Sequence, residues 1–96
     1  MKIIVDQRER NSGMIEELTK NGFDIEVKQL ITADYIIQSK NIENKIINIG
    51  IEKKTQSDFI NSIIDRRIIQ QLIYLKENFD VPLLIIEGSE NIYGLR

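Results

Sequence analysis

Hydrophobic residues follow two different spacings along the chain, and each spacing predicts one kind of element. Phe23, Ile25 and Val27 alternate with charged residues, a period of two that is typical of a half-buried strand. Between residues 55 and 78 the hydrophobic residues instead recur every three or four positions, as on one face of a helix. The chain is therefore expected to combine strands with helices.

Turn and capping residues divide the first half of the pattern into elements. Asn11 or Ser12 can cap a helix with a hydrophobic face, and Asn21 and Gly22 supply the residues that commonly end one. The expected strands of the whole chain lie at 1–5, 23–28, 33–39, 47–53 and 83–86.

The second helical stretch begins with a capping-box-like pair. Thr55 precedes Asp58 by three positions, and a Thr at that place can accept a hydrogen bond from the first helical turn. Charged residues at 65–67 interrupt the hydrophobic stripe before it continues to Asn78. Either one bent helix or two successive helices would fit, and we favour two.

The order strand, helix, three strands, two helices, strand predicts an α/β fold, a mixed sheet flanked by helices. We expect the three middle strands to form a meander. The run 83–86 is apolar on both faces, which predicts a buried strand parallel to the first. Eight residues follow Gly88, too few to cover a second face, so the single domain at 1–96 is interpreted as a fragment of a longer protein.

The composition excludes several kinds of site. The chain has no cysteine and no histidine, which removes a disulfide framework, a Cys/His zinc site, a thiol nucleophile and an imidazole base. Any bound metal must therefore use oxygen ligands. The net charge of −2 gives no overall attraction to nucleic acid, so DNA binding would need a local basic patch or a metal-neutralised acidic site.

No feature of the sequence points to a membrane. The apolar runs are far shorter than the roughly 20 residues of a membrane-spanning helix, and no leader pattern opens the chain. We therefore expect a cytoplasmic protein, or a nuclear one if the source is a eukaryote.

The strands at 33–39 and 47–53 flank a polar turn and are expected to form a hairpin. Antiparallel partners have residue numbers with a constant sum, and a turn centred on Glu43 places Asp34 opposite Glu52. Because side chains alternate between the two faces, Lys54 shares the face of these acids. Lys53 is expected on the opposite, apolar face.

Two acids and a lysine on one face match the needs of metal-dependent phosphodiester hydrolysis. Asp34 and Glu52 can bind Mg²⁺, which polarises the phosphate, and Lys54 can orient the attacking water or neutralise developing charge. The spacing alone is a weak signal, because any lysine-rich hairpin could supply it.

A plainer interpretation of the same residues stays open at this point. Asp34 would merely begin a strand, and the charges at 52–54 would protect the end of an edge strand. Asp58 would only complete the helix cap. The cluster at the end of the first strand would be a set of weak surface ion pairs, made by Asp6, Arg8 and Glu9.

Five collinear segments resemble the nuclease domain of the XPF/Hef family, a branch of the PD-(D/E)XK, restriction-endonuclease-like nucleases. They are V-D-Q-R-E at 5–9, A-D-Y-I-I at 33–37, I-E-K-K-T-Q-S-D-F at 51–59, S-I-I-D-R-R-I-I-Q-Q at 62–71 and P-L-L-I-I-E-G at 82–88. The family motif reads G-D, a variable gap and then E-R-K-x-x-x-D. Five segments in order are far more specific than any one of them.

The resemblance implies a role for each matching residue. The implied catalytic residues are Asp34, Glu52, Lys54 and Asp58. The implied ligands of Mg²⁺ or Mn²⁺ are Asp34, Glu52, Asp6 and Glu9. The implied DNA-binding or supporting residues are Arg8, Lys53, Arg66, Arg67 and Gln71.

The chain departs from the family motif at two positions. Ala33 stands in place of the family's Gly, a change expected to be mild if the strand conformation suits Ala. Lys53 stands in place of an Arg, and Lys keeps the charge but loses the bidentate geometry. Neither change removes a metal ligand, so an active enzyme is expected.

The resemblance implies a divalent-metal-dependent, structure-specific endonuclease domain that cuts branched DNA, such as flaps and forks, in DNA repair. It further implies a homodimer or heterodimer formed through the C-terminal helices. No zinc is expected, because the chain lacks cysteine and histidine. The alternative is a non-catalytic subunit with the same fold that serves as a dimerisation partner. A fragment with no function of its own is the third possibility.

Overall fold

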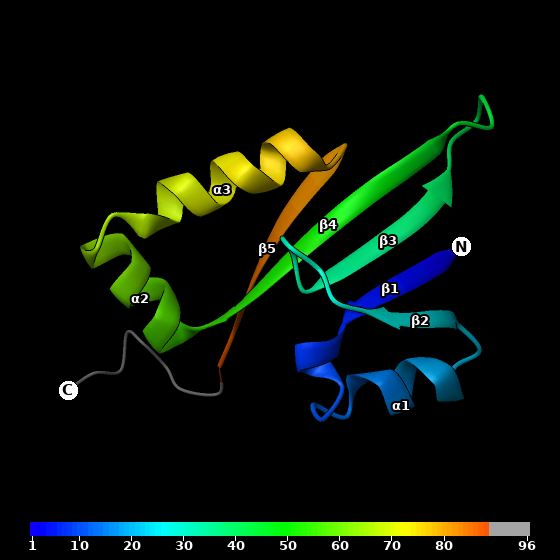
Figure 1. Ribbon diagram of the computed structural model, residues 1–96, viewed down its shortest axis with the longest axis horizontal. Helices are drawn as coiled ribbons and strands as arrows, with labels where there is room; N and C mark the ends of the chain where they lie inside the picture. Colours follow the sequence, from blue (N-terminus) through cyan, green and yellow to red (C-terminus); the bar gives the residue numbers. More distant parts are fainter. Residues whose placement is uncertain (89–96) are drawn as a thin grey trace.

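The computed structural model describes residues 1–88, in which five strands form one mixed sheet in the spatial order β2-β1-β3-β4-β5 (Figure 1). The strands are β1 (Lys2–Asp6), β2 (Asp24–Lys28), β3 (Tyr35–Lys40), β4 (Ile46–Thr55) and β5 (Val81–Glu87). The helices are α1 (Met14–Lys20), α2 (Gln56–Ile64) and α3 (Arg67–Asn78), with a short 3-10 helix, η1 (Gln7–Glu9), after β1. The predicted α/β fold and its order of elements are confirmed.

The hairpin of β3 and β4 has the predicted register. Tyr35 pairs with Ile51 and Gln38 pairs with Asn48 in an antiparallel ladder. The Gln38 and Asn48 side chains also meet, because Gln38 Nε2 donates a hydrogen bond of 3.1 Å to Asn48 Oδ1. The polar and apolar side chains of the hairpin therefore lie on opposite faces, as the alternation predicts.

The ends of the helices follow from local chemistry. Thr55 Oγ1 accepts a hydrogen bond of 3.1 Å from the backbone N–H of Asp58, so the predicted cap of α2 is confirmed. Gly22 follows α1 with a φ of 86°, a conformation that glycine adopts without strain. No helix within residues 1–88 is long and apolar enough to cross a membrane.

Helices lie on both faces of the sheet. On one face, Ile15 and Leu18 of α1 pack on the central core. On the other, α3 packs on β4 and β5, and the Phe79 ring lies so close to Gly50 that a Cβ there would collide with it. The buried core between α1 and the sheet consists of Ile3, Val5, Tyr35 and Ile51.

Two expected strand pairings are wrong. β2 pairs in parallel with β1 and not with β3, so the three middle strands do not form a meander. β5 pairs in parallel with β4 and not with β1. In both cases helices connect the two parallel strands, and a parallel pair needs such a crossover. Helical connections therefore decide the strand order here, and the strand sequences do not reveal it.

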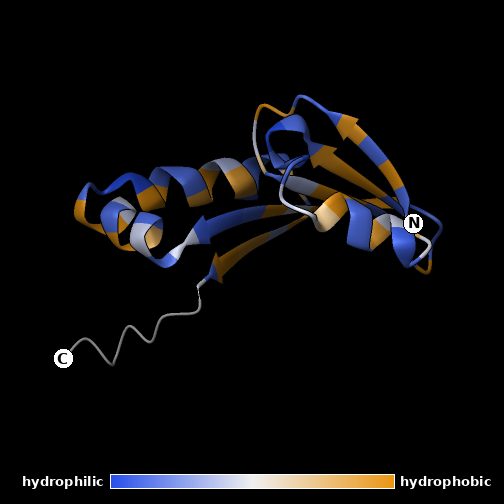
Figure 2. Cartoon of the chain, turned by 90° about the horizontal axis from the view of Figure 1, so that it is seen from below, coloured by the Kyte–Doolittle hydropathy of each residue, from blue (hydrophilic) through white to orange (hydrophobic). Residues whose placement is uncertain are grey.

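The prediction that the run 83–86 is buried is also wrong. β5 is an edge strand, and Val81, Leu83 and Ile85 are each 40–45% exposed. Figure 2 shows the largely hydrophobic colour of this strand. An apolar run without alternation cannot distinguish a central strand from an edge strand whose faces are only partly covered.

Candidate active site

Asp34 lies against β4 at the open end of the hairpin, directly before β3. Its backbone N–H donates a hydrogen bond of 2.8 Å to the Ile51 carbonyl. The backbone N–H of Lys53 in turn donates a hydrogen bond of 2.8 Å to Asp34 Oδ2. The regular ladder ends at Tyr35 and Ile51, and these two bonds instead hold Asp34 and its carboxyl group against residues 51 and 53 of β4.

Asp34 and Glu52 are both half-buried acids whose surroundings disfavour the charged form. Burial raises the pKa of Glu52, and the neighbouring Asp34 charge raises it further, although Lys54 acts in the opposite direction. Burial also raises the pKa of Asp34, and the hydrogen bond from Lys53 N only partly offsets this effect. A cation placed between such acids would relieve both the burial and the repulsion.

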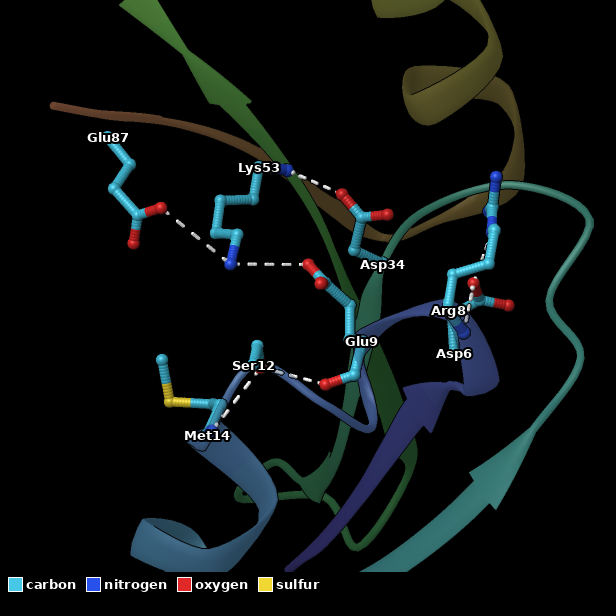
Figure 3. A network of polar contacts seen from close by, with 8 residues as sticks. All are labelled: Asp6, Arg8, Glu9, Ser12, Met14, Asp34, Lys53 and Glu87. Carbon is cyan, nitrogen blue, oxygen red and sulfur yellow. Dashed lines mark hydrogen bonds and ion pairs between the residues drawn. The ribbon is translucent and has the colours of Figure 1, made fainter.

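The two lysines that follow Glu52 have different environments. Lys54 is buried, with 9% of its surface exposed, and its charge lowers the pKa of Glu52. The Lys53 side chain forms ion pairs with Glu9 at 3.3 Å and with Glu87 at 3.8 Å (Figure 3). Lys53 also lines an apolar cavity on the α1 side of the sheet, as the alternation of side chains predicts.

Asp6 holds the loop after β2 and the start of η1 together. Its Oδ1 accepts a hydrogen bond of 2.7 Å from the backbone N–H of Leu30, and its Oδ2 accepts hydrogen bonds from the backbone and the guanidinium of Arg8. Burial would raise the pKa of Asp6, but these hydrogen bonds outweigh it and lower the pKa. Asp6 is completely buried. The plainer interpretation, in which Asp6 forms a weak ion pair on the surface, is therefore wrong for this residue.

Arg8 connects this buried acid with the acid pair. Its side chain is 68% exposed and ion-paired with Asp6, and its charge lowers the pKa of both Asp34 and Glu52. Arg8 also lines a cavity together with Glu52. The guanidinium is therefore a positive group beside the two carboxylates.

Four further candidate site residues lie apart from Asp34 and Glu52 or form contacts with other residues. Glu9 pairs with Lys53 on the α1 side, and Asp58 is exposed at the start of α2. Arg66 lies between α2 and α3, and Arg67 pairs with Asp65 at 3.3 Å. Among the described residues no cluster of three or more acids is arranged to hold a metal. The roles proposed for these residues stay predictions.

Ala33 has an unusual backbone conformation beside the acid pair. Its φ is 72°, in the left-handed region where a side chain is strained and glycine is not. The change from Gly to Ala was expected to be mild if the strand conformation suits Ala, and this condition is not met, because Ala33 is not in an extended conformation. Ala33 is buried and lines the same cavity as Glu52.

This cavity, of about 190 Å³, lies beside Glu52 and is called the Gln71 pocket below. Gln71 was identified from the sequence, whereas Thr32 and Tyr74, which also line it, were not. Tyr74 follows Gln71 by three positions, a spacing that puts two helical residues on one face. Nothing in the sequence around Thr32 predicts that it lines a pocket, apart from its position directly before Ala33. The full lining consists of Arg8, Ile31, Thr32, Ala33, Glu52, Gln71, Tyr74 and Leu75.

A model of the ERCC4 domain matches residues 5–96 of the chain. The chain belongs to the ERCC4 domain family. Its sequence is 42% identical over 89 residues to a putative ATP-dependent RNA helicase of Methanocaldococcus jannaschii, and 33% identical over 91 residues to the 3′-flap repair endonuclease Xpf of Saccharolobus solfataricus. The predicted membership of the XPF/Hef nuclease domains is confirmed.

Solved structures agree with this assignment of the ERCC4 domain. XPF from Aeropyrum pernix superposes on 93% of the chain with a TM-score of 0.75 and 31% identity. The complex of that protein with DNA superposes on 92% of the chain with a TM-score of 0.72 and 33% identity. The sheet and helices described above are therefore the restriction-endonuclease-like fold of these nucleases.

The ERCC4 domain makes up a small part of these relatives. The chain matches 93% of its own length but only 10% of the M. jannaschii protein, and 95% of its own length but 36% of the S. solfataricus endonuclease. It also covers 38% of the A. pernix chain.

Proposed function

We propose that this ERCC4 domain is a divalent-metal-dependent, structure-specific endonuclease domain that hydrolyses phosphodiester bonds in branched DNA during DNA repair. The observation that carries this proposal is the pair of half-buried acids, Asp34 and Glu52. The buried Lys54 follows Glu52 by two positions on β4. Family membership supports it. The similar S. solfataricus protein is a 3′-flap repair endonuclease, and one similar A. pernix structure contains DNA.

The donor set fits Mg²⁺ or Mn²⁺. Mg²⁺ in proteins commonly uses one or two carboxylates, several waters and substrate phosphates, and does not need a full cage of protein ligands. Asp34 and Glu52 supply two such carboxylates, and their raised pKa values reflect burial and repulsion that a bound cation would reduce. Once bound, the ion would stabilise charge on the phosphate oxygens and lower the pKa of a water.

The remaining residues of the site would position and neutralise the DNA backbone. Lys54 keeps its ammonium group near Glu52, where it can donate hydrogen bonds to a phosphate oxygen or to a water. Arg8 is aligned by the buried Asp6, so its exposed guanidinium can meet a second phosphate with little loss of side-chain freedom. Asp34 is aligned in the same way by the backbone of Lys53.

Cleavage of a labelled flap or fork by an excess of the chain, in a single turnover with Mg²⁺, tests the proposal. Glu52→Gln is expected to lose at least about 100-fold in rate, since it removes a metal ligand. Glu43→Gln is the matched control, because Glu43 is an exposed acid at the tip of the same hairpin. Equal cleavage by Glu52→Gln and the parent chain would contradict the proposal.

The partner of this domain is proposed to be a second chain with the same fold. Exposed hydrophobic side chains gather on the C-terminal elements, and large patches of this kind mark interfaces. On α2 and α3 they include Ile63, Ile64, Ile69, Leu72 and Ile73. On β5 they are Val81, Leu83, Ile85 and Ile86.

Sedimentation at micromolar concentration tests this interface. We expect a dimer that Ile73→Glu weakens, whereas Ile42→Glu, which changes a fully exposed residue in the β3–β4 turn, leaves it intact. A chain that sediments only as a monomer would contradict the interface. Dimers without metal-dependent cleavage would instead favour a non-catalytic partner subunit.

A further inference from the structure

The Gln71 pocket lies beside the acid pair and is large enough for part of a substrate. Its volume of about 190 Å³ is far above the roughly 10–15 Å³ that one water molecule requires. Glu52 lines it from the sheet, Thr32 from the loop before β3, and Gln71 and Tyr74 from α3. The pocket can therefore hold a group of several heavy atoms.

Two polar atoms of the pocket residues lack a hydrogen-bond partner among the described residues. Thr32 Oγ1 and Gln71 Oε1 are both buried and unpaired. Unpaired buried polar atoms are uncommon in native proteins, and a functional role of the residue or an unplaced water or ion is a common reason for them. Both residues line one pocket from different elements, so a ligand in the pocket would lie beside two polar side chains that have hydrogen-bonding capacity left over.

The charges around the pocket favour a neutral ligand. Arg8 and Glu52 carry opposite charges, so the lining has no net positive charge to hold an anion. A phosphate in the pocket would lie next to the Glu52 carboxylate. Tyr74 and Leu75 add aromatic and apolar lining. A flat, neutral group with a polar edge meets these conditions, and in DNA that group is the base.

We propose that the Gln71 pocket binds the base of an unpaired nucleotide next to the bond that is cut. The position relative to that bond rests on the proposed function, because Glu52 belongs to both the pocket and the proposed metal site. Thr32 and Gln71 hydrogen-bond the edge of the base, and Tyr74 packs on it. A base inside a duplex is paired and stacked, so the pocket selects DNA with an unpaired nucleotide at the site.

Titration of the ¹⁵N-labelled chain with a single-stranded deoxytrinucleotide in EDTA tests this proposal by NMR. EDTA removes the metal, so the result does not depend on cleavage. We expect the Gln71 side-chain amide and the Thr32 and Tyr74 backbone amides to shift on binding. The same trinucleotide with an abasic central unit should bind about tenfold more weakly, as expected from the loss of one stacked base.

Two variants separate the pocket from general DNA binding. Gln71→Ala should weaken binding of the intact trinucleotide about tenfold and make it indifferent to the abasic change. Gln70→Ala is the matched control, because Gln70 is the exposed neighbour on α3 and does not line the pocket. Equal affinity for the intact and abasic trinucleotides, or no shift at Gln71 up to millimolar ligand, would overturn the proposal. If the base binds but Mg²⁺ gives no cleavage, only the proposed function fails.

Discussion

The backbone N–H of Lys53 donates a hydrogen bond of 2.8 Å to Oδ2 of Asp34, while the Lys53 side chain forms ion pairs with Glu9 and Glu87. One residue thus aligns an acid of the site through its main chain and connects β4 to η1 and the end of β5 through its side chain. The alignment of Asp34 does not depend on which side chain stands at position 53.

Substitutions at Asp34 and Lys53 should therefore act differently on the Lys53 amide. In Lys53→Met the hydrogen bond to Asp34 stays, so the exchange rate of that amide with solvent should not change, although the lost ion pairs lower stability by about 1 kcal/mol. In Asp34→Ala the acceptor is removed, and exchange should become faster. Hydrogen exchange by NMR measures both, and fast exchange in Lys53→Met would contradict the described bond.

Ala33→Gly should stabilise the protein. Ala33 has a φ of 72°, and a non-glycine residue pays roughly 1–2 kcal/mol in that region. Gly costs roughly 0.5–1 kcal/mol through the entropy of the unfolded chain, so the difference is a net gain of up to about 1.5 kcal/mol in urea unfolding.

Gly22→Ala is the reciprocal control for Ala33→Gly. Gly22 has a φ of 86°, and a Cβ there would meet no atom within 4 Å, so only backbone strain changes. A loss of about 1 kcal/mol is expected. If Ala33→Gly lowered stability while Gly22→Ala behaved as expected, the conformation assigned to Ala33 would be wrong.

The acid pair should make the metal-free protein less stable as the pH rises. Burial and the Asp34 charge raise the pKa of Glu52 above its ordinary value of 4.5, so the folded state binds more protons than the unfolded state near that pH. Stability then falls as pH rises through the folded pKa. Asp6 has the opposite sign, because its lowered pKa gives stability that is lost as pH falls below its ordinary value of 3.8.

Glu52→Gln should remove the contribution of Glu52 to this pH dependence. In EDTA at neutral pH the variant should be at least as stable as the parent chain, and the difference should shrink as the pH falls towards 4.5. Glu43→Gln, which changes an exposed acid at the tip of the hairpin, is the control. A clear loss of stability in Glu52→Gln at neutral pH would instead assign Glu52 a structural role.

Local patterns were sufficient to predict the hairpin and its register. The constant sum of antiparallel partners places Gln38 opposite Asn48, and the ladder agrees. The alternation of side chains places Lys53 on the apolar face, and Lys53 lines the apolar cavity on the α1 side. The cap at Thr55 is equally local, because one hydroxyl accepts from a backbone N–H three residues later. These features depend on neighbours in sequence or across one tight connection.

Features that depend on distant segments were not predictable in this way. The partners of β2 and β5 are set by how helices cross the sheet, and the exposure of Leu83 is set by what covers an edge. The positive φ of Ala33 arises where the loop after β2 turns into β3. The Gln71 pocket likewise joins residues from η1, a loop, β4 and α3, which no single motif brings together.

The most direct test of the central claim is the site of Mn²⁺ binding in NMR spectra of the ¹⁵N-labelled chain. Substoichiometric Mn²⁺ should broaden the amide signals of Asp34 and of residues 51–54 first. The broadening should persist in Glu43→Gln and disappear in Glu52→Gln, because the two carboxylates act as a pair. Broadening centred on other acids, or unchanged broadening in Glu52→Gln, would contradict a divalent metal site at Asp34 and Glu52.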